Sequence, residues 1–426
     1  MNVTQMSSEF EQKLEKYAEI ILKIGLNLQP KQRLLIGGPS SSYDGVFLEA
    51  APLVRIIAQK AYQMGARLVD VVWGDDQLRL IRFNYGPKKS LKEYPKWRID
   101  ARLNISQAGD ANLHIIDSNP DLLKDVDLGL IARFQLHLHK HLKPVLDLVG
   151  QYALNWVIVP APSQAWADKI FPDIPPNERI QKLWDIIFKI CRIDQKDPIS
   201  AWQEHSENLH KRCMYLNKKQ YKTLKLTSPE TDLIIGLPKD HIWHGGSVKT
   251  LEGIDFIPNL PTEEIFTLPH KDRVDGIVKT TRPVFYQGQV VDECIFEFSN
   301  GRIIKAEAKV GNEIILKTID FDEGARRLGE VALVANSSPI SQTGKLYYNI
   351  LIDENAASHI AIGQAYRNSL KGGDTMTDEE FIAAGGNASL LHIDFMIGSG
   401  EMDVDGILED NNTEPVMRNG EWAFKI

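Results

Sequence analysis

Apolar residues at helical spacing open the chain. They recur three or four positions apart between Leu14 and Leu28, which is the period of an amphipathic helix. Ser8 and Glu11 have the spacing of a capping box at the start of such a helix. The pattern predicts a first helix that ends near Gly25.

Short apolar runs alternate with helical segments through the first half of the chain. We expect a helix at residues 53–65, and strands at 33–36, 67–73, 113–116 and 156–159. An order of strand, helix and strand favours a parallel sheet covered by helices. The sequence therefore predicts an N-terminal α/β domain over residues 1–237, with a mainly parallel sheet flanked by helices.

The pattern changes near Pro238. Residues 277–309 alternate in the manner of strands, and the pair Asn300-Gly301 lies between the runs 293–298 and 302–306. An Asn-Gly pair between two such runs is typical of a β-hairpin turn. We expect a second, α+β domain over residues 238–426 that is rich in antiparallel strand.

Two segments near the end of the chain place polar groups on apolar elements. Residues 359–366 are expected to form a helix on which His359, Gly363 and Tyr366 share one face, because residues four and seven apart do so. Residues 390–397 alternate as in a strand, which sends His392 and Asp394 to one face. An imidazole and a carboxylate then point the same way out of an apolar strand.

The composition is that of a globular protein in a reducing compartment. Of 426 residues, 43% are hydrophobic, and the formal net charge is −8, which argues against a nucleic-acid partner. Cys191, Cys213 and Cys294 lie too far apart in the sequence to indicate a disulfide framework or a Cys-based zinc site. We find no apolar run long enough to span a bilayer and no secretion signal, so we expect a cytoplasmic protein that does not bind membranes.

Two other polar motifs have simpler interpretations. The Gly- and Ser-rich stretch 37–42 follows a predicted strand and could receive a phosphate at a helix N-terminus. It lacks the glycine spacing and the lysine of a P-loop, which favours an ordinary turn. His137, His139 and His141 have no acidic residue within their run to complete a metal site, so they fit a helix surface better.

Two acidic segments lie upstream of the histidine motifs. Glu263 and Glu264 are adjacent in a short extended segment, where neighbouring side chains face opposite ways, so only one of them can face a given site. Glu330 begins an apolar strand, where a carboxylate is costly unless it is paired or bound to metal. Taken singly, each of these acids also fits an ordinary surface or structural role.

Several of these polar residues together indicate more than each does alone, namely Glu264, Glu330, His359, His392 and Asp394. The set combines oxygen and nitrogen donors without a thiolate, which suits zinc, cobalt or manganese. The three residues His359, His392 and Asp394 could hold only one open metal position, and the upstream carboxylates supply what a second ion requires. These are the residue types that a hydrolytic dinuclear metal site needs.

The sequence resembles the thermophilic-type metalloaminopeptidases, the M29 peptidase family, over essentially the whole chain. The motifs that carry the resemblance occur in the family's order at residues 258–266, 273–276, 329–334, 353–359 with Tyr366, and 392–398. The resemblance implies that two metal ions are bound by Glu264, Glu330, His359, His392 and Asp394. It leaves open which of Glu263 and Glu264 is the ligand, and it makes Tyr366 the catalytic tyrosine.

The hypothesis from this resemblance is an aminopeptidase that hydrolyses the N-terminal residue from peptides with a free N-terminus. Two divalent ions would activate water, with Glu330 bridging them, Tyr366 donating to the oxyanion, and Glu263 either a general base or a solvent-facing acid. The alternatives are a non-catalytic binding module with a buried His and carboxylate network, or a metallohydrolase of another amide. The resemblance also implies a homodimer, whereas the native metal and the preferred N-terminal residue stay open.

Overall fold

The computed structural model of the chain describes residues 8–38, 45–117, 119–286 and 288–426. The chain forms two compact units. One consists of Met1–Glu204 with Ser247–Pro261, and the other of His205–Gly246 with Thr262–Ile426. The expected domain division after residue 237 stays a prediction.

The first unit contains a four-stranded parallel sheet with the strand order β3-β1-β5-β6. Its strands are β1 (Arg33–Gly37), β3 (Leu68–Val71), β5 (Ala111–Ile116) and β6 (Trp156–Pro160), and β2 (Val46–Phe47) pairs with β4 (Trp73–Gly74) beside it. The predicted parallel sheet is therefore confirmed. Of the stretch considered for phosphate binding, residues 39–42 lie outside the described residues.

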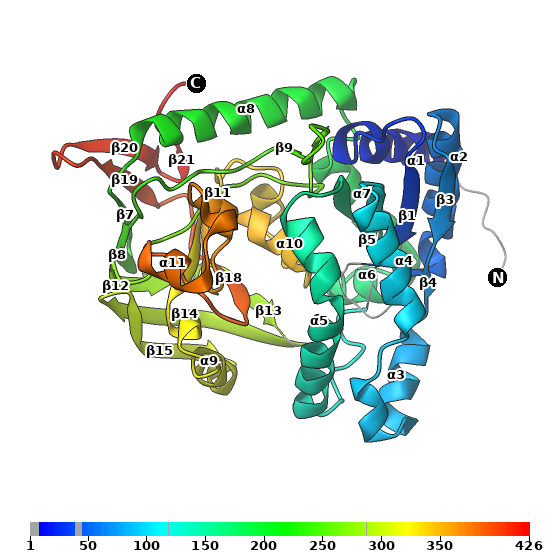
Figure 1. Cartoon of the computed structure of the whole chain (residues 1–426), viewed down its shortest axis with the longest axis horizontal. Coiled ribbons are helices and arrows are strands. Elements are labelled where there is room, and N and C mark those ends of the chain that lie inside the picture. The colour runs from blue at the N-terminus through cyan, green and yellow to red at the C-terminus, as the bar shows by residue number, and fades with distance from the viewer. Residues whose placement is uncertain (1–7, 39–44, 118, 287) are drawn as a thin grey trace. The chain divides into compact units, whose positions relative to one another are not determined.

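Helices connect the strands of this sheet, as Figure 1 shows for α2, α4 and α5. The helices up to the end of the first unit are α1 (Ser8–Ile20, continued by a π-helical turn at Ile21–Gly25), α2 (Ala51–Gln63), α3 (Asp76–Tyr85), α4 (Lys96–Gln107), α5 (Leu128–Gly150), α6 (Gln164–Ile170) and α7 (Pro176–Ile190). The three histidines at 137, 139 and 141 lie in α5. No helix in the described part of the chain is long and apolar enough to cross a membrane.

The second unit is built on two antiparallel sheets. The larger has nine strands in the order β13-β14-β12-β8-β7-β19-β20-β21, with β15 paired to β14. They are β7 (Thr223–Ser228), β8 (Thr231–Gly236), β12 (Val274–Lys279), β13 (Val284–Tyr286), β14 (Gln289–Ser299), β15 (Arg302–Val310), β19 (Asp403–Ile407), β20 (Thr413–Arg418) and β21 (Glu421–Trp422). The hairpin predicted at Asn300-Gly301 is confirmed, because both residues have positive φ and join β14 to β15.

The smaller sheet of this unit has the order β11-β16-β17-β18. Its strands are β11 (Ile265–Thr267), β16 (Leu328–Leu333), β17 (His359–Gly363) and β18 (His392–Met396), and the remaining helices are α8 (Pro198–Lys219), α9 (Asn312–Ile319), α10 (Ile350–Asp353) and α11 (Asp378–Ala383). A two-stranded ribbon of β9 (Val248–Lys249) and β10 (Asp255–Phe256) belongs to the first unit.

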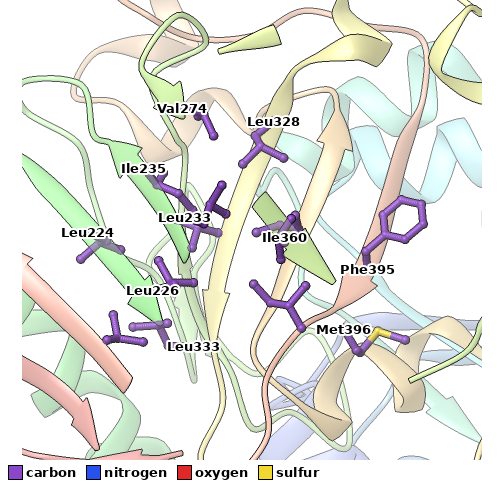
Figure 2. Close-up of a cluster of buried hydrophobic side chains, with 14 of the residues drawn as sticks. Leu224, Leu226, Leu233, Ile235, Val274, Leu328, Leu333, Ile360, Phe395 and Met396 are labelled. Carbon is purple, nitrogen blue, oxygen red and sulfur yellow. The ribbon is translucent and has the colours of Figure 1, made fainter. Parts of the chain in front are cut away.

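One face of the smaller sheet is apolar. Figure 2 shows side chains of both sheets in one buried cluster, among them Leu226 and Leu233 from the large sheet and Leu333, Ile360 and Phe395 from the small one. Burial of each such side chain contributes about 1.5–3 kcal/mol to folding. Because side chains alternate along a strand, the residues between these apolar ones point to the opposite face.

The helix expected at residues 359–366 is wrong. Residues His359–Gly363 form strand β17, which is paired on one side with β16 and on the other with β18. A short buried apolar run with two isoleucines is ambiguous between helix and strand by periodicity alone, and pairing on both sides decides it. The expected strand at 390–397 is confirmed as β18.

Gly363 ends β17 in a conformation that other residues rarely adopt. Its φ is +101°, and a Cβ atom there would lie 2.2 Å from the carbonyl oxygen of Leu391. We expect Gly363→Ala to lower the free energy of unfolding by about 2–4 kcal/mol, because β18 must shift away or the backbone must strain. Denaturant unfolding followed by circular dichroism measures this change.

Gly150 at the end of α5 provides the matched control. A Cβ atom at Gly150 would meet nothing within 4 Å, so Gly150→Ala is expected not to lower the free energy of unfolding and to raise it by at most about 1 kcal/mol. An equal, small effect of both substitutions would contradict the role assigned to Gly363.

Candidate metal centre

Strand pairing brings polar side chains together on the face of the small sheet opposite its apolar face. Glu330 in β16 lies opposite Ala361 in β17, and Ala361 lies opposite Asp394 in β18. Two residues further along β16, Ala332 lies opposite His359 of β17. Directly opposite residues in an antiparallel pair project to the same face, and the small alanines leave room between the larger polar groups.

Five side chains form two groups that share Glu330. One group is Glu264, Glu330 and His359, and the other is Glu330, His392 and Asp394, each with ligand atoms within 4.8 Å of one another. Of the site residues expected from the sequence, these five are brought together. Glu264 immediately precedes β11, so the groups come from all four strands of the sheet or their ends.

The two oxygens of Glu330 face different histidines. Its Oε1 lies 3.5 Å from Nε2 of His359, and its Oε2 lies 3.8 Å from Nε2 of His392. Nε2 of His359 also lies 3.1 Å from Oε2 of Glu264, and Nε2 of His392 lies 3.2 Å from Oδ1 of Asp394. A carboxylate with one oxygen toward each group has the geometry of a bridge.

Both histidines are oriented by hydrogen bonds from their other ring nitrogen. Nδ1 of His359 donates to the carbonyl oxygen of Ala357 at 3.0 Å, and Nδ1 of His392 donates to that of Gln364 at 2.7 Å. A carbonyl oxygen only accepts, so each Nδ1 carries a proton, and the Nε2 atom of each ring is the one that faces the carboxylates. This is the arrangement of metal-binding histidines, and the residues present therefore fit divalent ions.

The buried charges perturb one another strongly. Burial alone would lower the pKa of His359, but hydrogen bonds to Glu264 and Glu330 outweigh it and raise that pKa well above its usual value. Burial would also lower the pKa of His392, but the negative charges of Asp394 and Glu330 outweigh it and raise that pKa to about 9. Burial raises the pKa of Glu330. Such a concentration of buried carboxylates is costly without compensating positive charge.

Glu354 is a member of this environment that the sequence reasoning missed. It lies in a 3-10 turn, Glu354–Ala356, just before β17. Burial, followed by the charges of Glu264 and Asp394, raises its pKa well above the usual value. In the sequence, Glu354 stands in the same short motif as His359, five residues before it, and this position could have identified it.

Asn355 links Glu354 to the acidic segment upstream. Its Oδ1 accepts a hydrogen bond from the backbone N–H of Glu263 at 2.7 Å, and its Nδ2 donates to Oε1 of Glu354 at 3.4 Å. Asn355 is fully buried. One amide side chain therefore holds the segment that carries Glu264 beside the turn that carries Glu354.

Glu263 and Glu264 face different partners, as expected for neighbours in an extended segment. Glu264 joins the group around His359, whereas Oε2 of Glu263 lies 3.6 Å from Nε2 of His205 in α8. The same His205 nitrogen donates to the carbonyl oxygen of Thr262 at 2.8 Å. Glu263 is buried next to the five-residue cluster without being one of its members.

Tyr366 lies beside the cluster although the predicted helix is absent. It precedes a 3-10 turn, Arg367–Ser369, and its ring centroid is 5.2 Å from that of His392 and 5.8 Å from that of Phe266. Loss of solvation and the negative charges of Glu330 and Asp394 raise the pKa of its phenol well above the usual value. The protonated hydroxyl is a hydrogen-bond donor, and half of the residue's surface is exposed to solvent.

The chain is similar to known peptidases over nearly its full length. A family model described as thermophilic metalloprotease (M29) matches residues 10–422. Aminopeptidase 2 from Geobacillus stearothermophilus is 43% identical over 419 residues, which cover 98% of this chain and all of that protein. Aminopeptidase T from Thermus thermophilus is 41% identical over 414 residues, which cover 97% of this chain and 99% of that protein.

Two solved structures share the fold. The structure titled wild-type AmpT from Thermus thermophilus matches with a TM-score of 0.91 and 40% identity, covering 97% of this chain and all of that one. A 2,5-dihydroxypyridine dioxygenase from Pseudomonas putida matches with a TM-score of 0.51 and 10% identity. The second likeness concerns the fold alone.

Proposed function

The chain belongs to the M29 family of thermophilic metalloproteases and is a metal-dependent aminopeptidase, and we propose that it works with two divalent ions held by Glu264, Glu330, His359, His392 and Asp394. The observation that carries this proposal is the pair of ligand groups that share Glu330. The expectation of a hydrolase is confirmed by its aminopeptidase relatives, which sets aside the alternative of a non-catalytic binding module.

When bound, such ions supply a water of lowered pKa and polarise the scissile carbonyl. The protein's own groups then handle protons and charge. The hydroxyl of Tyr366 is proposed to donate a hydrogen bond to the carbonyl oxygen as its negative charge develops. Its ring lies beside that of His392, at the edge of the cluster.

Two carboxylates are proposed as carriers of the proton from water to the leaving amine. The sequence suggested Glu263, and the structure adds Glu354 as a second candidate. Glu354 is favoured because the charges of Glu264 and Asp394 act on it directly, whereas the carboxylate of Glu263 lies toward His205. A general base must come within hydrogen-bonding reach of the proton it accepts.

The acidic residues beside the proposed ligands offer a reason for a requirement of a free N-terminus. Two carboxyl groups outside the ligand set, those of Glu263 and Glu354, lie next to the centre. The protonated amine of a peptide is proposed to bind to the carboxyl groups of the site. An N-acetylated peptide lacks that charge, so its resistance to hydrolysis separates an aminopeptidase from a hydrolase of other amides.

Metal removal tests the proposal. We expect a chelator to abolish release of p-nitroaniline from an aminoacyl-p-nitroanilide, and zinc, cobalt or manganese to restore it, while circular dichroism shows the fold retained. Elemental analysis of the restored protein should give two ions per chain. Undiminished hydrolysis after complete metal removal, or full activity with one ion per chain, would contradict the proposed dinuclear centre.

The cellular setting is proposed from the state of the cysteines and from the family resemblance. Cys191, Cys213 and Cys294 are all free and buried, which suits a reducing compartment such as the cytoplasm. A homodimer is proposed because the family resemblance implies one. Light scattering at several protein concentrations tests the dimer, and cell fractionation tests the location.

A further inference from the structure

A cavity of about 400 Å³ lies in the second unit, apart from the five clustered residues. This volume is within the range of pockets that bind small ligands. Its walls come from the segments that flank the small sheet, namely residues 281–283, Asn336, 344–346, Asp353, Met396 and 398–400. None of the five proposed metal ligands is among the residues that line it.

The cavity nevertheless adjoins the metal centre. Met396, in its wall, is the strand partner of His359 and follows Asp394 by two residues on β18. Two residues of strand span roughly 6.6 Å, and Asp353 in the wall directly precedes Glu354. A peptide residue adds at most about 3.5 Å in extended form, so about two peptide residues match the length of strand between Asp394 and Met396.

The charges that line the cavity are mainly positive. Arg282 and Lys345 contribute cationic side chains, against the single carboxylate of Asp353. The oxygens of Asp353 accept the backbone N–H groups of Tyr347 at 2.7 Å and Asn349 at 2.9 Å, and its charge also acts on Arg282. The guanidinium of Arg282 is positioned by donating to the carbonyl oxygen of Ser341 at 3.1 Å.

We propose that this cavity, the Arg282–Lys345 pocket, binds the C-terminal carboxylate of short peptides whose N-terminal residue lies at the metal centre. The acidic centre and the cationic pocket would then bind the two opposite charges of one zwitterionic peptide. The preferred substrates are accordingly peptides of about two to four residues. This inference rests on the proposed function of the metal centre, because it specifies which peptides that centre hydrolyses.

The test compares Leu-Gly-Gly with its C-terminal amide in the metal-loaded full-length protein. We expect kcat/KM for leucine release to be about tenfold higher for the free acid, because charged hydrogen bonds to a carboxylate are lost in the amide. The ratio should shrink as salt is raised, since Lys345 is exposed and its charge is screened.

Substitutions in the pocket test which residues determine the ratio of kcat/KM for the free acid to kcat/KM for the amide. Lys345→Met should bring the acid-to-amide ratio toward one, and Lys345→Arg should retain it. Arg282→Gln, which can still donate to Ser341, should lower the ratio as well. Lys317→Met on α9 is the matched control, because Lys317 is 80% exposed and outside the pocket, and its ratio should equal that of the wild type.

Each outcome decides a different question. Equal kcat/KM for acid and amide in the wild type, or an unchanged ratio in Lys345→Met, would overturn the Arg282–Lys345 pocket while leaving the aminopeptidase intact. Absence of leucine release from both peptides would instead refute the proposed function. A ratio that falls in Lys345→Met and is restored in Lys345→Arg supports the pocket.

Discussion

Glu330→Gln is expected to reduce kcat/KM for peptide hydrolysis by at least about 10³-fold. Glu330 directs one carboxylate oxygen to each ligand group, and an amide cannot supply two anionic oxygens. Substitution of residues that only hold metal ligands in place already lowers metal affinity or activity by about 10- to 100-fold. Steady-state kinetics on an aminoacyl-p-nitroanilide and elemental analysis should show the loss of activity together with fewer than two ions per chain.

Glu313→Gln is the matched control for this substitution. Glu313 lies on α9, and its side chain is 90% exposed, so the same change of chemistry should leave kinetics and metal content at wild-type values. Circular dichroism should show that both variants are folded. A Glu330→Gln protein that retains two ions and activity within tenfold of wild type would rule out Glu330 as the shared ligand.

Tyr366→Phe is expected to lower kcat by about 10²- to 10³-fold while metal content and KM stay close to wild type. The substitution removes one hydroxyl, and loss of a single donor to a developing oxyanion has an effect of this size. The aromatic contacts with His392 and Phe266 are retained by phenylalanine. The separation of kcat from KM and from metal content distinguishes a catalytic hydroxyl from a structural one.

Tyr85→Phe offers the comparison, since Tyr85 ends α3 and is 83% exposed. Its kcat should be unchanged. If Tyr366→Phe turned over substrate as fast as the wild type, the proposed donor would have to be another group. Loss of metal in Tyr366→Phe would instead assign the hydroxyl to the binding of the ions.

Local sequence patterns were sufficient for much of the fold. The parallel strands at 33–36 and 113–116, the hairpin at Asn300-Gly301 and the strand that carries His392 and Asp394 follow from apolar alternation and turn chemistry. These elements are determined by residues close in sequence, which a pattern can record. The five clustered side chains were identified from motif resemblance rather than from periodicity.

Other features depend on contacts between distant residues. The strand at His359–Gly363 is fixed by pairing with β16 and β18, which no local pattern reveals. Glu354 became a candidate only when folding brought Glu264 and Asp394 close to it. The Arg282–Lys345 pocket joins residues from six segments of the chain, so neither its volume nor its charge was visible in the sequence.

The contribution of all four strands of the small sheet to one centre has a consequence during protein synthesis. Strand β18 follows β11, β16 and β17 along the chain, so a nascent polypeptide lacks His392 and Asp394 until β18 has been synthesised. Its earlier segments carry Glu264, Glu330 and His359 but not the second ligand group. We therefore expect the growing chain to be inert toward peptides, and products truncated before β18 to accumulate without proteolytic harm to the cell.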